Sequence, residues 1–228
     1  MSDELIRKHD GQLTRLTLNR PAKANALSAP LVEALIDAVD YAYTDGTRLL
    51  VLDGAGNHLC AGFDFSAYQE QSEGDLVLRF IRVETLVLAH GKIFGAGADL
   101  VAACGMRVAA PGTTFRMPGL RFGVVLGTRR LTYRIGADHA RSILGESRTF
   151  GTDEALGIDY ITQIAEPAQW PALLLELQAR CALLTPAASA ALHRQTTPDT
   201  RADDMAALAR SVSVPGIKER IRLYRENA

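Results

Sequence analysis

The stretch LAHGKIFGAGADLVAAC, residues 88–104, decides how the rest of the chain is interpreted. An apolar run that predicts a strand is interrupted by Gly91, Gly95 and Gly97, and the sequence then continues with helical spacing. The only acidic residue of the stretch, Asp99, falls in the first turn of that expected helix. The first N–H groups of a helix have no intrahelical partner. The pattern therefore predicts a strand, a tight turn and a helix, with backbone donors near one carboxylate.

The sequence before this stretch predicts a strand, a helix and a second strand. Residues 13–21 alternate apolar and polar side chains, which is typical of a half-buried strand. Residues 28–46 have Ser28 as an N-cap, an early proline and one apolar face, so they predict an amphipathic helix. Residues 48–56 predict a strand buried on both faces. This order indicates an α/β protein.

After residue 104 the sequence predicts short strands at 106–110, 113–117 and 160–164, and mostly helices from residue 127 onward. Helical spacing recurs at 138–145, 168–182, 186–195, 201–211 and 215–226. The composition changes near Glu166 and Pro167. We therefore expect a core over residues 1–165 and a helical C-terminal region over residues 166–228.

One connection conflicts with these assignments. Residues 74–86 predict a helix that would run directly into the strand expected over 87–94, whereas connections between elements usually contain about 2 to 6 residues. Either the chain carries a deletion here, or a segment between Thr85 and Leu86 is absent from it. The second explanation is favoured, and a break in the chain at that point would support it.

The composition limits the classes of partner. The 228 residues include 47% hydrophobic residues, 25 Lys and Arg, and 26 Asp and Glu, giving a formal charge of -1. Such a balance gives no overall field that would attract nucleic acid or an anionic membrane. The cysteines, three in number, lack the spacing of a disulfide framework or metal site, and no apolar run approaches the roughly 20 residues of a membrane span. We expect a soluble, cytoplasmic protein.

Two glycine turns follow expected strands, at DGAGNHLCAG (53–62) and FGAGADL (94–100). Neither has both the third glycine and the later acid of a dinucleotide site, and no serine-hydrolase, zinc-protease or Walker motif occurs. Each turn alone could be only a tight turn. If backbone N–H groups of the two turns faced each other, they would form an oxyanion hole.

Three stretches together carry a family resemblance: LNRPAKANALS at 18–28, LCAGFDFS at 59–66, and HGKIFGAGADLVAACGMRVAAPGTTFRMP at 90–118. Their order and spacing resemble the crotonase, or enoyl-CoA hydratase/isomerase, superfamily. The resemblance implies an α/β fold with a repeated ββα spiral core and a C-terminal helical region. It also implies an enzyme that acts on an acyl-CoA thioester, assembled as a homotrimer or a dimer of trimers, with the helical region packing between subunits.

The resemblance also implies roles for individual residues. The backbone N–H groups of Phe63 and Ala96 would bind the thioester oxygen, and Asp99 would be a catalytic carboxylate. No metal and no cofactor is expected beyond the coenzyme A moiety of the substrate. That moiety would contact six residues: Lys23, Ala24, Ala26, Ala61, Asp64 and Phe65.

The chain departs from the family pattern at the second catalytic acid, where FRMPGLRFG has Gly119. Hydration that uses two carboxylates would lack one of them, whereas a single carboxylate can move a proton between two carbons. Isomerisation of a double bond is therefore chemically easier here, although hydration is the commonest activity in the superfamily. The alternative is a non-catalytic acyl-CoA-binding or assembly subunit that lost its second acid.

Other side chains have open roles. His90 is expected to be a turn residue rather than a base. Glu84 could enter the pocket if a loop folds back over it. Arg129 and Arg130 could bind an anionic group, but we expect them to form structural ion pairs.

Overall fold

A computed structural model describes residues 3–64 and 84–227 of the chain. The larger sheet has the strand order β1-β2-β3-β4-β6-β9. β1 is antiparallel to β2, and the other neighbours are parallel. The strands are Leu5–Asp10, Leu13–Leu18, Leu49–Gly54, Glu84–Ala89, Met106–Ala109 and Gln163–Ile164. The smaller sheet has the order β5-β7-β8, with strands Lys92–Phe94, Thr114–Arg116 and Phe150–Gly151.

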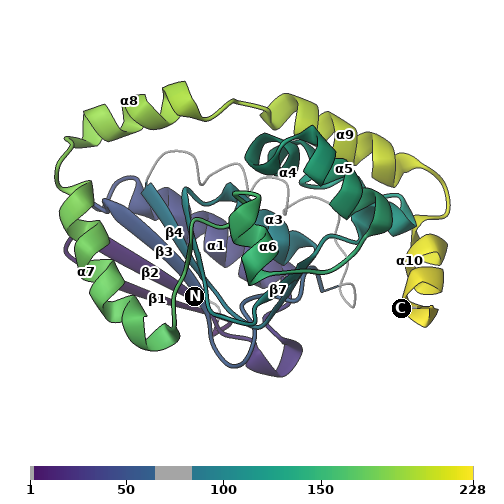
Figure 1. The fold of residues 1–228 in the computed structure, drawn as a ribbon, viewed down its shortest axis with the longest axis horizontal. Helices are drawn as coiled ribbons and strands as arrows, with labels where there is room; N and C mark the ends of the chain where they lie inside the picture. Colours follow the sequence, from purple (N-terminus) through teal and green to yellow (C-terminus); the bar gives the residue numbers. More distant parts are fainter. Residues whose placement is uncertain (1–2, 65–83, 228) are drawn as a thin grey trace.

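The chain alternates between the two sheets. β4 lies in the larger sheet, β5 in the smaller one, and helix α3 (Ala96–Ala103) follows directly. The next turn repeats this path with β6, β7 and then α4 (Thr128–Ile135) and α5 (Ala137–Glu146). In Figure 1, α4 and α5 lie beside α3 on the right of the molecule. The path confirms the expected α/β fold with its ββα repeat, and it places the start of α3 directly after β5 of the smaller sheet.

Helix α1 (Ala29–Ala42) confirms the amphipathic helix predicted from the sequence. The Ser28 hydroxyl accepts a hydrogen bond from the Leu31 N–H at 3.3 Å, as an N-cap does. The apolar face of the helix is buried through Leu31, Val32, Leu35, Ala38, Val39 and Ala42.

The prediction of a break between Thr85 and Leu86 was wrong. Glu84–Ala89 is one continuous strand, and Thr85 and Leu86 pair in register with Leu50 and Val51 of β3. The helical assignment of residues 84–86 was therefore mistaken. The rest of that expected helix, residues 74–83, lies outside the described residues.

Two other elements differ from the sequence predictions. β1 was not predicted, because most of its side chains are exposed at the edge of the sheet and the segment is polar. β9 is only Gln163–Ile164, whereas a strand was expected over 160–164. Tyr160 precedes that strand and is fully buried. Its ring packs edge-on against Phe115 and Phe150, at centroid distances of 5.0 and 5.1 Å.

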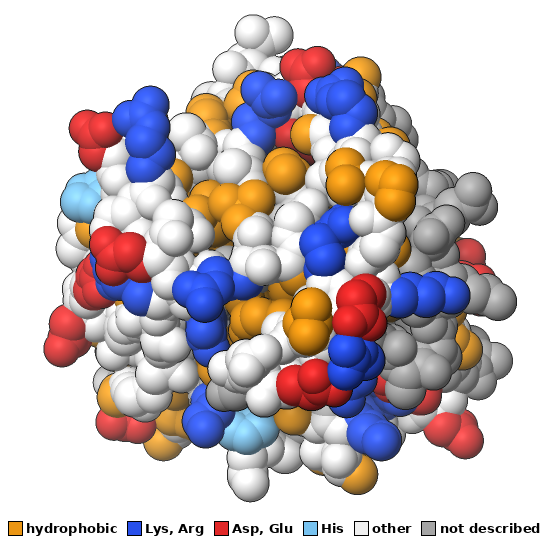
Figure 2. Space-filling view, turned by 90° about the vertical axis from the view of Figure 1, so that its right-hand side faces the viewer, with side chains coloured by type: hydrophobic (Ala, Val, Ile, Leu, Met, Phe, Trp, Pro, Cys, Tyr) orange, Lys and Arg blue, Asp and Glu red, His pale blue; other side chains and the backbone are white. Residues whose placement is uncertain are grey.

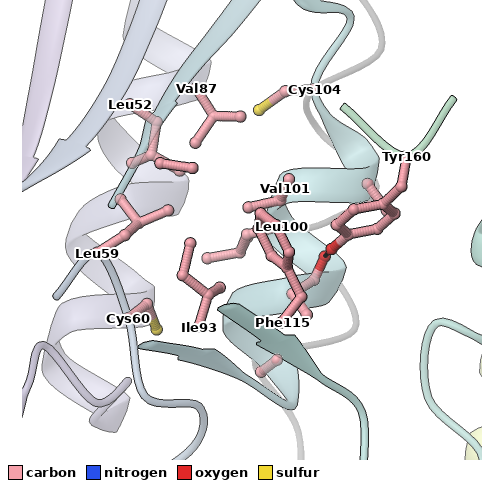
Figure 3. Packing of buried hydrophobic residues seen from close by; sticks show 14 of the residues in the cluster. Leu52, Leu59, Cys60, Val87, Ile93, Leu100, Val101, Cys104, Phe115 and Tyr160 are labelled. Atoms are coloured by element: carbon pink, nitrogen blue, oxygen red, sulfur yellow. Dashed lines mark hydrogen bonds between the residues drawn. The ribbon is translucent and has the colours of Figure 1, made fainter. Parts of the chain in front are cut away.

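The main hydrophobic core lies between the larger sheet and helices α1 and α3 (Figure 3). Leu52, Val87, Ile93 and Leu100 are buried there. In the same view the Tyr160 hydroxyl points at α3, where it donates to the Ala98 carbonyl at 2.6 Å. The fully buried Tyr160 side chain thus anchors the first turn of α3.

Two arginines hold the C-terminal end of α3. Arg134 Nε donates to the Ala102 carbonyl at 2.9 Å, and Arg107 Nη1 donates to the Gly105 carbonyl at 2.7 Å. Arg107 Nε also donates to the Tyr160 carbonyl at 2.7 Å. Burial lowers the pKa of Arg107 to about 10. Because cations at a helix C-terminus satisfy its last carbonyls, α3 is fixed at both ends.

The second face of the larger sheet packs against α7 (Trp170–Cys181) through a separate cluster that includes Leu49, Leu86 and Leu177. Helices α8 (Pro186–Thr196), α9 (Arg201–Ser213) and α10 (Ile217–Glu226) then pass over the molecule, with α9 next to α4 and α5 in Figure 1. Shorter helices are α6, Thr152–Gly157, and the 3₁₀ turns Pro21–Lys23, Gly119–Phe122 and Pro167–Gln169.

The C-terminal helices were all predicted within a few residues of their ends. The division of the chain at residues 165 and 166 stays a prediction. Among the described helices, none combines the length and the apolar composition that crossing a membrane requires.

Candidate active site

The first component of the site is the start of α3. Gly95 has a φ of 53°, donates its N–H to the Arg116 carbonyl at 2.8 Å, and precedes the helix as its N-cap. Its own carbonyl accepts the Asp99 N–H at 3.1 Å. As the first residue of the helix, Ala96 has no intrahelical acceptor for its N–H. This N–H is a donor fixed in direction by the turn.

The second component is the segment around Phe63. Leu27 and Phe63 form a parallel bridge, in which the Leu27 N–H donates to the Gly62 carbonyl and the Asp64 N–H donates to the Leu27 carbonyl, both at 2.8 Å. In such a bridge the central residue directs its own N–H away from the partner strand. The Phe63 N–H therefore points away from Leu27.

The two components are in direct backbone contact. A β-carbon added at Gly62 would lie 2.9 Å from the Phe94 carbonyl oxygen and 3.9 Å from the Ala96 nitrogen. Gly62 also has a φ of 104°, a conformation that other residues rarely adopt. A glycine is thus required for the Phe63 turn to reach the start of α3. The structure brings Phe63 and Ala96 into neighbouring turns, as an oxyanion hole would need.

Asp99 is buried in the first turn of α3, with its side chain 1% exposed. Arg130 of α4 donates from Nη1 to Oδ1 at 2.7 Å. The other oxygen, Oδ2, is buried and has no hydrogen-bond partner among the described residues. Burial raises the pKa of this carboxyl, and the Arg130 guanidinium opposes the rise. The Asp99 carboxyl therefore keeps its proton to a higher pH than an ordinary aspartate.

The structure brings together only some of the residues expected to contact coenzyme A. The Ala61 N–H donates to the Ala24 carbonyl at 2.9 Å, which joins the two motifs, and Ala24 adopts a left-handed φ of 48°. Lys23 is exposed and Ala26 is half-buried beside them. Asp64 is paired with Arg20 at 2.9 Å, so its carboxylate is already engaged. Phe65 lies outside the described residues.

Asn25 is a residue whose role the sequence did not reveal. Its side chain is fully buried, accepts the Arg20 N–H at 2.7 Å, and donates to the carbonyls of Ala55 and His58, both at 2.8 Å. It thus fastens the first motif to the turn that leads to Phe63. A polar side chain in a tight Ala-Asn-Ala turn is a signal for such a contact, but its partners lie far along the chain.

The position of the second family acid offers no side chain. Gly119 begins the 3₁₀ turn Gly119–Phe122, and a β-carbon there would lie 2.9 Å from the Val124 carbonyl oxygen. Glu84 cannot replace that acid. It lies near Gly105, at the opposite end of α3 from Ala96, and pairs with His193 at 3.0 Å.

The other open side chains behave as expected. His90 lies in the turn between β4 and β5, where its Nε2 is 3.1 Å from the Gly56 carbonyl oxygen. Arg129 and Arg130 both form ion pairs, with Asp204 of α9 as the shared acid at 3.1 and 3.9 Å. The contact between Arg130 and Asp99 was not predicted.

Figure 2 shows the face of the molecule that forms the right-hand side of Figure 1. Apolar side chains gather in its hollowed centre, and Lys and Arg side chains stand around them. Such a surface suits a ligand with an apolar part and an anionic part. Among the described residues, no group of three or more His, Cys, Asp or Glu side chains is arranged to hold a metal ion.

Comparison with known proteins places these features in context. The chain matches the enoyl-CoA hydratase/isomerase family over residues 8–214. It is 31% identical over 184 residues to a probable enoyl-CoA hydratase of Mycobacterium leprae, covering 73% of this chain and 74% of that protein. It is 30% identical over 195 residues to the ethylmalonyl-CoA decarboxylase of Mus musculus, covering 78% of this chain and 60% of that protein.

A crystal structure from Bordetella parapertussis, provisionally named enoyl-CoA hydratase/isomerase, shares 49% sequence identity with the chain. The two superpose with a TM-score of 0.90 over 98% of each chain. An enoyl-CoA hydratase/isomerase of Pseudoalteromonas atlantica, at 22% identity and a TM-score of 0.86 over 99% and 98% of the two chains, has the same fold.

Proposed function

The chain belongs to the enoyl-CoA hydratase/isomerase family, and on that premise we propose that it is an enzyme that converts an acyl-CoA thioester through an enolate. The observation that supports the proposal is that the Gly62 backbone lies against the start of α3. Phe63 and Ala96, whose N–H groups we propose as the two donors, therefore lie in neighbouring turns, and Asp99 is in the first turn of the same helix. Removing a proton next to a thioester places negative charge on its oxygen, and two fixed donors stabilise that charge.

Isomerisation is the reaction that a single carboxylate can complete. Asp99 would remove a proton from carbon 2 of a 3-enoyl thioester, so that the electron pair moves into the thioester and forms the enolate. The same carboxyl would return the proton to carbon 4, giving the 2-enoyl thioester with atoms and charge balanced. Hydration would need a second group to hold water, and Gly119 supplies none.

Coenzyme A is proposed to lie along the joined motifs of residues 20–27 and 59–64. The Ala24 to Ala61 hydrogen bond and the buried Asn25 fix these backbones, which supports contact with the ligand through main-chain atoms. Lys23 is exposed there and could pair with a phosphate. We propose no cofactor beyond the coenzyme A moiety of the substrate.

The absence of a side chain at Gly119 favours one other candidate, a non-catalytic acyl-CoA-binding or assembly subunit. A panel of 2-enoyl-, 3-enoyl- and dienoyl-CoA substrates separates the two candidates, with a malonyl-type thioester included because of the decarboxylase relative. We expect turnover of the 3-enoyl thioester to exceed hydration of the 2-enoyl thioester. Tight binding of every thioester without turnover would contradict the enzymatic proposal and support the subunit.

We also propose that the chain assembles as a homotrimer or a dimer of trimers. The C-terminal region exposes large apolar side chains: Leu175 at 70%, Leu183 at 81% and Leu192 at 50%. Sedimentation should give three or six times the chain mass, and Leu183→Glu should lower it. Leu156→Glu, on the exposed part of α6, is the matched control and should leave the mass unchanged. A monomeric wild type would refute the assembly.

A further inference from the structure

Arg130 lies between two carboxylates that come from different parts of the chain. Its Nη1 is 2.7 Å from Oδ1 of Asp99 on α3, and its Nη2 is 3.9 Å from Oδ2 of Asp204 on α9. Asp204 is also held by Arg129 at 3.1 Å and by the Thr200 hydroxyl at 2.7 Å. Asp99, Arg130 and Asp204 thus form a continuous series of ion pairs, the ion chain.

We propose that Arg130 is a positioning residue that binds only Oδ1 of Asp99, favours the charged form of that carboxylate inside the core, and leaves Oδ2 as the oxygen that takes the substrate proton. Asp204 weakens the stabilisation of the Asp99 charge, because it attracts the same guanidinium. Since Asp204 belongs to α9, the position of α9 affects the ionisation of Asp99. The transfer of a substrate proton to Oδ2 rests on the proposed function, but the electrostatic effect of the ion chain on Asp99 can be tested without turnover.

The start of α4 acts on the same oxygen as Arg130. Gly127 is the N-cap of α4 and has a φ of 68°. A β-carbon added there would lie 2.4 Å from Oδ1 of Asp99 and 2.6 Å from its Cγ. The N-terminus of a helix stabilises a negative charge placed against it. Both the guanidinium and the helix therefore favour charge at Oδ1, while Oδ2 keeps its lone pairs free of described partners.

An unpartnered oxygen alone would not single out Asp99. Asp53 of β3 is also buried, accepts from Arg15 Nε at 2.7 Å through Oδ2, and has no described partner for Oδ1. Asp53, however, lies within a strand and pairs in register with Thr17. Asp99 differs because it shares one helical turn with the Ala96 N–H. Asp53 is consequently a matched control for a buried aspartate with one arginine partner.

The charged and titratable groups around Asp99 have opposing effects. Burial raises the pKa of its carboxyl, Arg130 lowers that pKa, and Asp204 raises it. Tyr160 lies beneath the same turn, but its hydroxyl donates to the Ala98 carbonyl. Loss of Arg130 should therefore raise the pKa of Asp99, and loss of the charge on Asp204 should lower it. Shifts of opposite sign would show that both charged partners act electrostatically on the Asp99 carboxyl.

The test is a ¹³C NMR titration of protein labelled at the aspartate carboxyl carbons, with the Asp99 signal assigned by Asp99→Asn. Relative to wild type, Arg130→Gln should move its midpoint to higher pH and Asp204→Asn to lower pH. Arg130→Lys should restore most of the wild-type position, since the charge is kept. Asp53→Asn should leave the Asp99 signal where it is. Asp204 is 21% exposed, so Asp204→Asn tests the ion chain even if Arg130→Gln does not fold.

Kinetics give a second readout. With a thioester that is turned over, Arg130→Gln should lower kcat roughly tenfold at the acidic end of the profile and recover at alkaline pH, while KM changes little. Midpoints that stay fixed, or that move in the same direction in both variants, would overturn the inference. Opposite shifts without turnover of any thioester would keep the ion chain and reject the proposed function. Turnover with fixed midpoints would reject the ion chain alone.

Discussion

Asp99→Asn is expected to lower kcat for the 3-enoyl thioester by about 10²- to 10⁴-fold, the usual contribution of a positioned acid or base. The amide has the shape of the carboxylate and can still face Arg130, but it cannot carry a proton between two carbons. Substrate binding should change much less than kcat, because the proposed thioester contacts are backbone N–H groups. The measurement is a steady-state assay of both proteins on the same substrate panel.

The control for that loss is Asp53→Asn, which removes the charge from another buried aspartate with an arginine partner. It should lower the melting temperature without lowering kcat of the folded protein. Equal rates for wild type and Asp99→Asn would remove Asp99 from the mechanism. Equal losses in Asp99→Asn and Asp53→Asn would mean that damage to a buried ion pair, rather than lost proton transfer, explains the effect.

The pH dependence follows from the same carboxyl. Because burial raises the pKa of Asp99, the ionised base is populated only above a pH higher than that of an ordinary aspartate. For proton abstraction, kcat should therefore rise with pH across that raised value. Folding stability has the opposite dependence: a carboxyl whose pKa is raised in the folded state lowers the stability as pH rises above its unfolded-state pKa.

Local patterns made much of the fold predictable. Ser28 caps α1, and the apolar period of that helix is the face that it buries, so both signals lie within one short segment. The glycines of the opening stretch likewise mark the start of α3. Gly97 is needed because a β-carbon there would lie 2.4 Å from the Cys60 carbonyl oxygen, a contact that the sequence cannot show.

The failures came from segments whose neighbours decide their structure. Residues 84–86 are a strand because they pair with β3, although their pattern was interpreted as the end of a helix. The family resemblance identified Asp99 as the first acid and showed that Gly119 stands at the position of the second. It did not locate Arg130 as the partner of Asp99, because the two residues are 31 positions apart and only the packing of α4 on α3 brings them together.

The second large effect is expected for Ala96→Pro. Proline has no N–H, so one of the two proposed donors is removed. Proline is tolerated at the first position of a helix, and Gly95, with φ 53° and ψ -119°, is not in the helical conformation that a following proline disfavours. We expect kcat/KM to fall by about 10²- to 10³-fold, equivalent to about 2.7 to 4 kcal/mol of lost transition-state stabilisation.

The matched control is Ala137→Pro. Ala137 is also the first residue of a helix, α5, and follows Gly136, which has a φ of 79°. It is exposed and lies in no part of the proposed site. This variant should keep the wild-type kcat/KM and nearly the wild-type melting temperature. A comparable loss of activity in Ala137→Pro would show that proline at a helix start, and not the missing donor, is responsible.

The most direct test of the oxyanion hole is the carbonyl stretching frequency of a bound, unreactive acyl-CoA thioester, measured by isotope-edited infrared spectroscopy with a ¹³C-labelled carbonyl. Two N–H donors polarise the carbonyl, so the band should move to lower frequency in wild type and in Ala137→Pro than in water. In Ala96→Pro most of that shift should disappear. A band at its aqueous frequency in wild type, or an undiminished shift in Ala96→Pro, would contradict the role assigned to Phe63 and Ala96.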